Sequence, residues 1–290
     1  MGAYWRDGRG RYDTEDSYDN FPQYLDDKNL KVFTSSDRMW TYRMNGDGIE
    51  LLRYNDRQIH IKVPSVVDGR KVNSLSYTFD GFHELKSVEI PDGVTSMVGA
   101  FFGCTGLEEA HMPDGVKDLS HAFESCFSLK DLWIPDSVTN FSYAFSEAAL
   151  ESIAFPQGAL EIQAAFSASL CLKRAIIPKT IQKSYEAFCT CENLEYVELE
   201  EGIQALGDYM FFDCHALKEL KIPKSVKKIG QQAVGIYDVL EPGVEGYGPG
   251  PVFRVAGQAP VPSFRIVGVR GTVAERYARR EGIPFVEAEE

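Results

Sequence analysis

Cysteine and histidine are the residues of this 290-residue chain with the most obvious capacity for chemistry, because both side chains bind metals and act as nucleophiles or bases. Cys189, Cys191, Cys214 and His215 lie near one another and could bind zinc. Their separations match no zinc-finger or zinc-ribbon spacing, so we expect no metal site. Four cysteines instead share one repeat position, where we expect small, buried, reduced side chains: Cys104, Cys126, Cys191 and Cys214.

The histidines and a glycine-rich stretch give no catalytic or cofactor motif. No histidine stands near a serine, cysteine or aspartate at the spacing of a known triad, although a triad assembled in space leaves no such spacing. The stretch 246–251, Gly-Tyr-Gly-Pro-Gly-Pro, superficially resembles a phosphate-binding loop. Prolines follow it in place of a helix, which favours an ordinary loop. We therefore predict neither an enzyme nor a bound cofactor.

Asp92, Asp114 and Asp136 occupy one position in three consecutive repeats, which would stack their carboxylates about 5 Å apart. Calcium could use such a stack. Pro-Asp-Gly and Pro-Asp-Ser are also ordinary turn sequences, and the same position holds Gln157 and Lys179 in the next two repeats. The pattern favours turns over a calcium site.

The net charge of −13 makes nucleic acid and anionic membranes poor partners, because binding phosphates needs clustered lysine and arginine. No stretch approaches eighteen apolar residues, so we expect no membrane insertion. The polar, acidic start of the sequence shows no signal peptide. Two cellular locations fit the sequence: the cytoplasm for the sequence as given, and the cell surface or the exterior if an export signal has been removed.

The elements that position these residues are repeats of about 22 residues. A proline that follows an apolar residue recurs at Pro64, Pro91, Pro113, Pro135, Pro156, Pro178 and Pro223, with Glu200 at the equivalent place in one repeat. The segments share the pattern Cys-x-x-Leu-x-x-φ-x-φ-Pro-x-x-φ, where φ is apolar. A phenylalanine column precedes it: Phe79, Phe101, Phe123, Phe145, Phe166, Phe188 and Phe211. We expect one short strand per repeat, stacked into a parallel sheet with the apolar columns inside.

These segments resemble the BspA-like leucine-rich repeats of bacterial surface proteins. The Ala-Phe element of that family stands at Ala100-Phe101, Ala122-Phe123, Ala144-Phe145, Ala165-Phe166 and Ala187-Phe188. The resemblance runs from about residue 40 to residue 285 and implies an α/β or mainly β solenoid: a right-handed leucine-rich-repeat coil with a parallel sheet on one face. It also implies a protein-binding or adhesion role.

Caps are expected at both ends, because an open solenoid exposes the core of its terminal repeats. Residues 40–54 predict a hairpin about the turn Asn45-Gly46-Asp47-Gly48. Residues 272–281 predict a helix with Thr272 as N-cap and Gly282 as C-cap. The expected divisions are an extended or mobile arm (1–28), an N-terminal cap with the hairpin (29–60), the solenoid (61–235), and a loop insert, last strand and C-terminal helical cap (236–290).

The exposed strand face gives the strongest functional signal. Its outward positions are mostly polar, but Trp133 and Ile176 are not, and a neighbouring outward column supplies Asp131, Arg174 and Tyr196. Apolar and aromatic residues beside arginine are typical of binding hot spots. We predict a partner-binding site formed by Trp133, Ile176, Arg174, Tyr196, Asp131 and His111. The alternative is that the N-terminal arm or the 241–251 insert covers this patch.

Two functional hypotheses follow from this face. The first is a non-catalytic protein-protein interaction or adhesion module. The second is a carbohydrate-binding module in which Trp133 and Tyr196 stack on sugar rings while Asp131 and Arg174 bond hydroxyl groups. An enzyme is the weakest hypothesis, because catalysis needs convergent acids, bases or metals.

Overall fold

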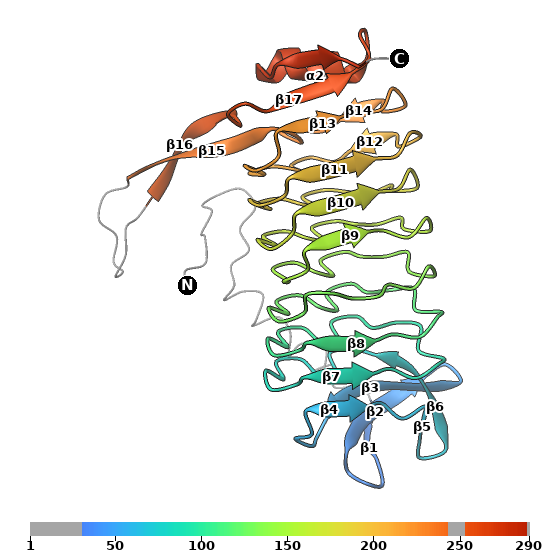
Figure 1. Cartoon of the computed structure of the whole chain (residues 1–290). Helices are drawn as coiled ribbons and strands as arrows, with labels where there is room; N and C mark the ends of the chain where they lie inside the picture. The colour runs from blue at the N-terminus through green and yellow to red at the C-terminus, as the bar shows by residue number, and fades with distance from the viewer. Residues whose placement is uncertain (1–30, 243–252, 289–290) are drawn as a thin grey trace.

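The computed structural model describes residues 31–242 and 253–288. The predicted arm, residues 1–28, and most of the glycine- and proline-rich insert lie outside the described residues. The rest forms an elongated stack of coils in which each repeat makes one turn (Figure 1). The fold is the predicted mainly β solenoid.

Short parallel strands line one face of the stack, as the repeat pattern predicts. They pair in three three-stranded sheets rather than in one continuous sheet. In order along the solenoid these are β4 (His60–Lys62), β7 (Ser87–Glu89) and β8 (Glu109–His111); β9 (Ser152–Ala154), β10 (Arg174–Ile177) and β11 (Tyr196–Leu199); and β13 (Glu219–Lys221), β17 (Arg265–Gly268) and β18 (Phe285–Glu287). The register pairs the expected columns, for example Ile153 with Ala175 and Ala175 with Val197.

The expectation of a strand in every repeat is wrong for segment 129–135, which forms no strand although it follows the repeat pattern. Figure 1 shows this plain coil between β8 and β9. Its two inward residues, Leu132 and Ile134, are only half-buried and pack against the edge of the core. The next repeat brings two rings into the adjacent core: Phe141 and Phe155 meet edge to face, with ring centroids 5.1 Å apart.

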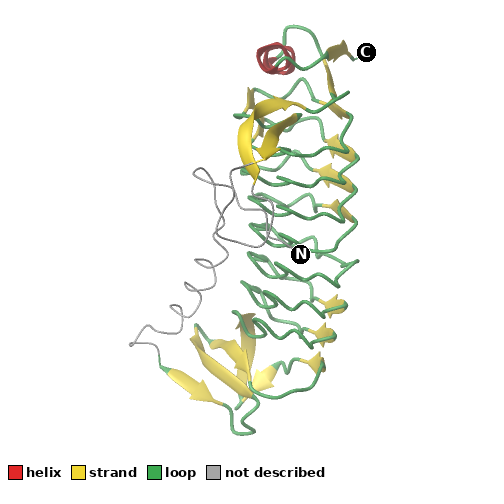
Figure 2. Cartoon of the chain, turned by 90° about the vertical axis from the view of Figure 1, so that its left-hand side faces the viewer, coloured by secondary structure: helices red, strands yellow, loops and turns green. Residues whose placement is uncertain are grey.

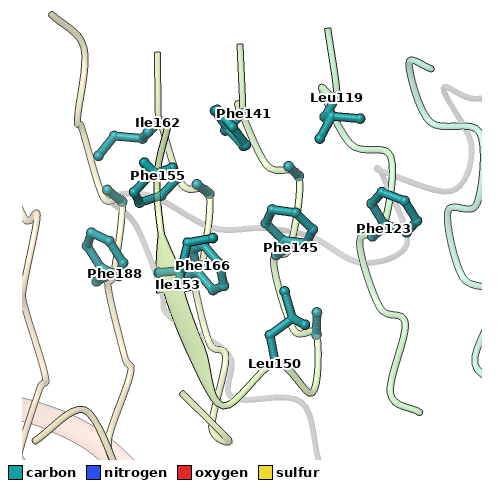
Figure 3. Close-up of a cluster of buried hydrophobic side chains, with 14 of the residues drawn as sticks. Leu119, Phe123, Phe141, Phe145, Leu150, Ile153, Phe155, Ile162, Phe166 and Phe188 are labelled. Carbon is teal, nitrogen blue, oxygen red and sulfur yellow. The ribbon is translucent and has the colours of Figure 1, made fainter. Parts of the chain in front are cut away.

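The phenylalanine column is an unbroken ladder through the core. Successive rings from Phe79 to Phe211 lie with centroids 5.1–5.8 Å apart. Figure 3 shows Phe123, Phe145, Phe166 and Phe188 in one row, with Phe155 against them. Five of the six steps are stacked, and only the Phe145–Phe166 step is tilted, at 31°. The ladder confirms that one repeat buries its apolar side only against its neighbours.

The cysteine column holds hydrogen-bond donors. The thiol of Cys104 donates to the carbonyl of Phe79 in the preceding repeat at 3.0 Å, and Cys126, Cys191 and Cys214 do the same to Phe101, Phe166 and Phe188. Ser169 takes this place in another repeat and donates to Phe145 at 2.7 Å. In these five repeats the position requires a small side chain that carries a donor, whereas the equivalent Ala148 fills it without one.

This requirement can be tested at Cys126, which is fully buried. Cys126→Ser keeps the donor and should change the free energy of unfolding by less than about 1 kcal/mol, whereas Cys126→Ala should lower it by about 1–2 kcal/mol. Urea denaturation followed by circular dichroism measures both values. A serine variant that is less stable than the alanine variant would contradict the donor role.

One departure from the proline pattern has a local explanation. The N–H of Glu200, which a proline would lack, donates to the carbonyl of Ile177 at 3.1 Å and extends the pairing of β10 with β11. The turn after the strand is unchanged, because the N–H of Ile203 donates to the carbonyl of Glu200 just as that of Val226 donates to Pro223. The substitution lengthens the ladder without altering the coil.

A second, weaker ladder runs along the other side of the coil. Single parallel bridges join successive repeats from Ser74 to Lys183, and β12 (Ala205–Leu206) pairs with β14 (Lys228–Ile229). Two residues of each repeat that flank the phenylalanine adopt positive φ, for example His121 and Ser125 around Phe123. The sharp corner built by these residues turns the chain back toward the strand face.

The first described residues form a five-stranded sheet, shown at the lower end of Figure 1 and in yellow at the lower end of Figure 2. The predicted hairpin is present, since β2 pairs antiparallel with β3 about the expected turn. Trp40 and Tyr54 lie against Phe79, with centroids 6.1 and 5.7 Å from its ring. In order across the sheet, the strands are β1 (Val32–Thr34), β2 (Trp40–Asn45), β3 (Gly48–Tyr54), β6 (Arg70–Leu75) and β5 (Val66–Val67).

The other end holds an antiparallel ribbon and a helix. Strands β15 (Ile236–Pro242) and β16 (Phe253–Pro260) form the ribbon, which projects from the stack in Figure 1. Helix α2 (Val273–Glu281) follows β17, and Gly282 ends it in the predicted left-handed conformation, at φ 70°. The prediction for Thr272 is wrong in one respect. It occupies the N-cap position, but its hydroxyl donates to the carbonyl of Val269 and does not cap the helix.

Candidate functional site

A groove opens on the strand face where the sheet is interrupted. It has a volume of about 670 Å³ and lies between the strand of one repeat and segment 129–135 of the next. We call it the Trp133 groove. Its lining residues are Glu108, Glu109, Ala110, His111, Phe127, Ser128, Lys130, Asp131, Leu132 and Trp133.

The groove exists because the backbone ladder stops there. One repeat earlier, the N–H groups of Glu108 and Glu109 both donate to the carbonyl of Lys86. In the described part of the chain, no backbone hydrogen bond joins residues 130–134 to either neighbouring repeat. The peptide groups of this groove-lining segment are therefore free of the ladder that occupies the strand backbone elsewhere.

The structure divides the six predicted site residues into two sets. His111, Asp131 and Trp133 line the groove. The other three, Arg174, Ile176 and Tyr196, lie on β10 and β11 at the far side of β9. Trp133 is the most exposed of the chain's large apolar side chains described here, with 61% of its surface accessible.

The second set has internal contacts of its own. The guanidinium of Arg174 lies over the ring of Tyr196, 4.5 Å from its centroid. The Tyr196 hydroxyl donates to a carboxylate oxygen of Glu198 at 3.2 Å. Ile176 is half-buried between its neighbours on the sheet. This part of the face presents a pre-formed cation–aromatic pair rather than free groups.

Two important groove residues are absent from the prediction. Phe127 is 54% exposed and lies in the turn before the strand position, so a survey of outward strand positions misses it. Glu109 stands directly before Asp131 in the same outward column. The available signals were a large aromatic residue in a turn and two acids at one repeat position in successive repeats.

The position after each repeat leucine forms a charge column that alternates in sign along the whole solenoid: Lys86, Glu108, Lys130, Glu151, Lys173, Glu195 and Lys218. Lys86 pairs with Glu108 at 2.7 Å, and Lys173 pairs with Glu151 at 3.0 Å. The hydrogen bond from each lysine, with its charge, lowers the pKa of each of these two glutamates. The charge column largely neutralises itself.

Glu109 and Asp131 lie outside this alternation. Neither makes a side-chain hydrogen bond or an ion pair with any described residue. Both are exposed at the groove, beside the indole of Trp133. The groove therefore joins two aromatic side chains to two carboxylates that have no side-chain partner among the described residues.

The four cysteines of the repeat column, which were candidates for chemistry, have a structural role. Burial raises the pKa of the Cys104, Cys126, Cys191 and Cys214 thiols far above the ordinary range, so these groups stay protonated. Within residues 31–242 and 253–288, no group of three or more histidine, cysteine, aspartate or glutamate side chains is arranged to hold a metal ion. The same described residues include no helix long and apolar enough to cross a bilayer.

Known proteins were compared with the chain as a whole. A family described as BspA type leucine rich repeat region matches in six copies, over residues 72–186 and 120–236. A leucine rich repeat protein of T. pallidum, TpLRR, is 27% identical, with 66% of this chain and 89% of that chain covered and a TM-score of 0.55. No curated protein matches.

A leucine-rich repeat protein from Bacteroides ovatus shares the fold at 18% identity, with 89% of this chain and 67% of that chain covered and a TM-score of 0.55. The family matches together run from residue 72 to residue 236, which is more than half of the chain. Proteins built from such repeats are typically non-catalytic and generally mediate protein interactions. With its ladder of buried phenylalanines and its short parallel strands, the chain belongs to the BspA type leucine-rich repeat family.

Proposed function

We propose that the chain is a non-catalytic protein-protein interaction or adhesion module that binds its partner on the strand face around Trp133. The observation that carries the proposal is the Trp133 groove, where a largely exposed indole stands at an interruption of the sheet. Exposed tryptophan is uncommon on a solvated surface and is enriched where proteins bind one another.

The face has the dimensions and the mixture of groups that a protein partner uses. Four strand spacings of about 4.8 Å separate the repeat of His111 from that of Tyr196, so the predicted residues span about 20 Å. Trp133 and Ile176 supply apolar area, and Arg174 on Tyr196 supplies a rigid cation. A protein surface can contact both sets at once, which a single sugar ring cannot.

The proposal includes a role for the two ends of the solenoid. The β2–β3 hairpin would cap the first repeat, because Trp40 and Tyr54 lie on the first ring of the phenylalanine ladder. Helix α2 would cap the last, because Tyr277 is buried and its hydroxyl donates to the carbonyl of Val234 at 3.1 Å. Capped ends leave the strand face as the surface available for a partner.

The proposal predicts that a library of random peptides panned on the protein yields binders that depend on Trp133. Trp133→Ala combined with Ile176→Glu should weaken the enriched peptides by more than about tenfold, because buried aromatic anchors dominate interfaces. Val66→Ala is the matched control, since Val66 is exposed on the terminal sheet, away from the strand face. Thermal melting of each variant verifies the fold, and Trp133→Ala alone serves if Ile176→Glu is unstable.

Three results would count against a protein-binding face at this position. The first is a library that yields no binder, and the second is a set of binders that the double variant retains. The third is a glycan array that binds the protein through Trp133 while no peptide does, which would establish the carbohydrate hypothesis in its place.

A further inference from the structure

We infer that the Trp133 groove receives a cationic side chain, arginine or lysine, from an extended basic segment of the partner. The inference rests on the proposed function and specifies the chemistry of what binds there. It depends on the charges, the aromatic groups and the peptide groups that meet in the groove.

The charges come first. Glu109 and Asp131 occupy one outward column in adjacent repeats and both line the groove, Glu109 from β8 and Asp131 from segment 129–135. Within the described residues each lacks an ion-pair partner, while Glu108 beside them is already paired with Lys86. Two negative charges that line one groove attract a cation that can lie between them.

The aromatic groups add a second reason for a cation. Trp133 and Phe127 line the same groove and expose more than half of their surfaces. A guanidinium or ammonium within about 6 Å of an aromatic face is attracted to the ring, most strongly to tryptophan. Arginine suits the groove best, because its flat guanidinium can lie on the indole while its N–H groups reach the carboxylates.

The chain already contains this combination on the same face. Arg174 lies over Tyr196, and the Tyr196 hydroxyl is bonded to the carboxylate of Glu198. In the Trp133 groove the aromatic ring and the carboxylates are present, but no arginine lines it, and its own Lys130 makes no ion pair with Glu109 or Asp131 among the described residues. A partner's arginine would complete there the arrangement that Arg174 completes on β10.

The shape of the groove favours an extended segment. It runs alongside segment 129–135, whose backbone makes no hydrogen bond to the neighbouring repeats within the described chain. An extended peptide in the groove can bond these peptide groups while every second side chain points toward the protein. Anionic ligands are disfavoured by Glu109 and Asp131.

The test uses two fluorescein-labelled peptides of glycine and serine with three arginines at alternate positions, or with citrulline in place of each arginine. Citrulline has nearly the same shape without the charge. Fluorescence polarisation with the full chain at about 50 mM salt should show at least about tenfold tighter binding of the arginine peptide. Glu109→Gln with Asp131→Asn should remove most of that difference.

The control is Glu195→Gln with Asp92→Asn, which makes the same change in net charge at two exposed acids away from the groove. It should alter binding by less than about twofold. Equal binding of the two peptides overturns the inference. An equal loss in the control variant also does, because it would mean that the overall charge of −13 attracts the peptide without a site.

The same variants separate this inference from the proposed function. In one outcome, the library peptides depend on Trp133 but bind equally well to the Glu109→Gln, Asp131→Asn variant. This result would support the binding face and overturn the cationic ligand. In another outcome, the arginine peptide and the library peptides still bind to Trp133→Ala, which would overturn the proposed function and the inference together.

Discussion

Phe123→Ala is expected to lower the free energy of unfolding by about 3–5 kcal/mol, the largest effect of any single substitution considered in this chain. Phe123 is fully buried, and its ring stacks on Phe101 at 5.3 Å and on Phe145 at 5.7 Å. Removing the ring opens a cavity and breaks the ladder on both sides. Each repeat is stabilised mainly by its neighbours, so the cavity weakens the packing of this repeat against the repeats on both sides.

The matched control is Phe127→Ala in the same repeat. Phe127 is mostly exposed in the groove, so removing its ring should change stability by less than about 0.5 kcal/mol. Urea denaturation of the two variants and the unchanged protein, followed by circular dichroism, gives both values. Similar losses for the two substitutions would contradict the ladder as the main source of stability.

Gly207→Ala is expected to cost about 1–3 kcal/mol, although it adds only one methyl group. A Cβ at this position would lie 2.7 Å from the backbone nitrogen of Tyr185 and 2.8 Å from the carbonyl oxygen of Ser184. These are backbone atoms of the preceding repeat, so the repeats themselves would have to separate. The hydrogen bond from the Gly207 N–H to the Ser184 hydroxyl, 3.0 Å long, would be strained as well.

Gly257→Ala provides the comparison for this second substitution. Gly257 lies in β16 with nothing within 4 Å of the added Cβ, and alanine there should be neutral or slightly stabilising. Melting temperatures of the two variants measure the difference. A Gly207→Ala protein as stable as Gly257→Ala would mean that the repeats in this part of the solenoid are not in close contact.

Much of the fold was predictable because the same buried positions recur in every repeat of a solenoid. The phenylalanine and leucine columns fall in phase over seven repeats, and a residue that recurs every 22 positions on a buried face must meet its own copies. The hairpin followed from its turn sequence, and the end of α2 followed from Gly282. These features depend on local sequence, or on a strict repeat, and both can be recognised without coordinates.

The groove could not be predicted in the same way. Segment 129–135 has the same repeat pattern as its neighbours, yet it forms no strand and its inward residues are only half-buried. The depth at which a segment packs depends on three-dimensional contacts that a repeat pattern does not record. Trp133 and Asp131 were identified from their outward positions on the strand face. Phe127 lies in a turn, and its place in the groove depends on the path of that turn.

The alternating charge column has a consequence for the accuracy of folding. A chain that skips one repeat while stacking would place lysine against lysine, or glutamate against glutamate, at the point of the skip. That one like-charge contact costs only a few tenths of a kcal/mol, and the later contacts of the column keep their alternation. A loss of two neighbouring repeats leaves the alternation intact. The column therefore gives such an array a small preference for gaining or losing repeats in pairs.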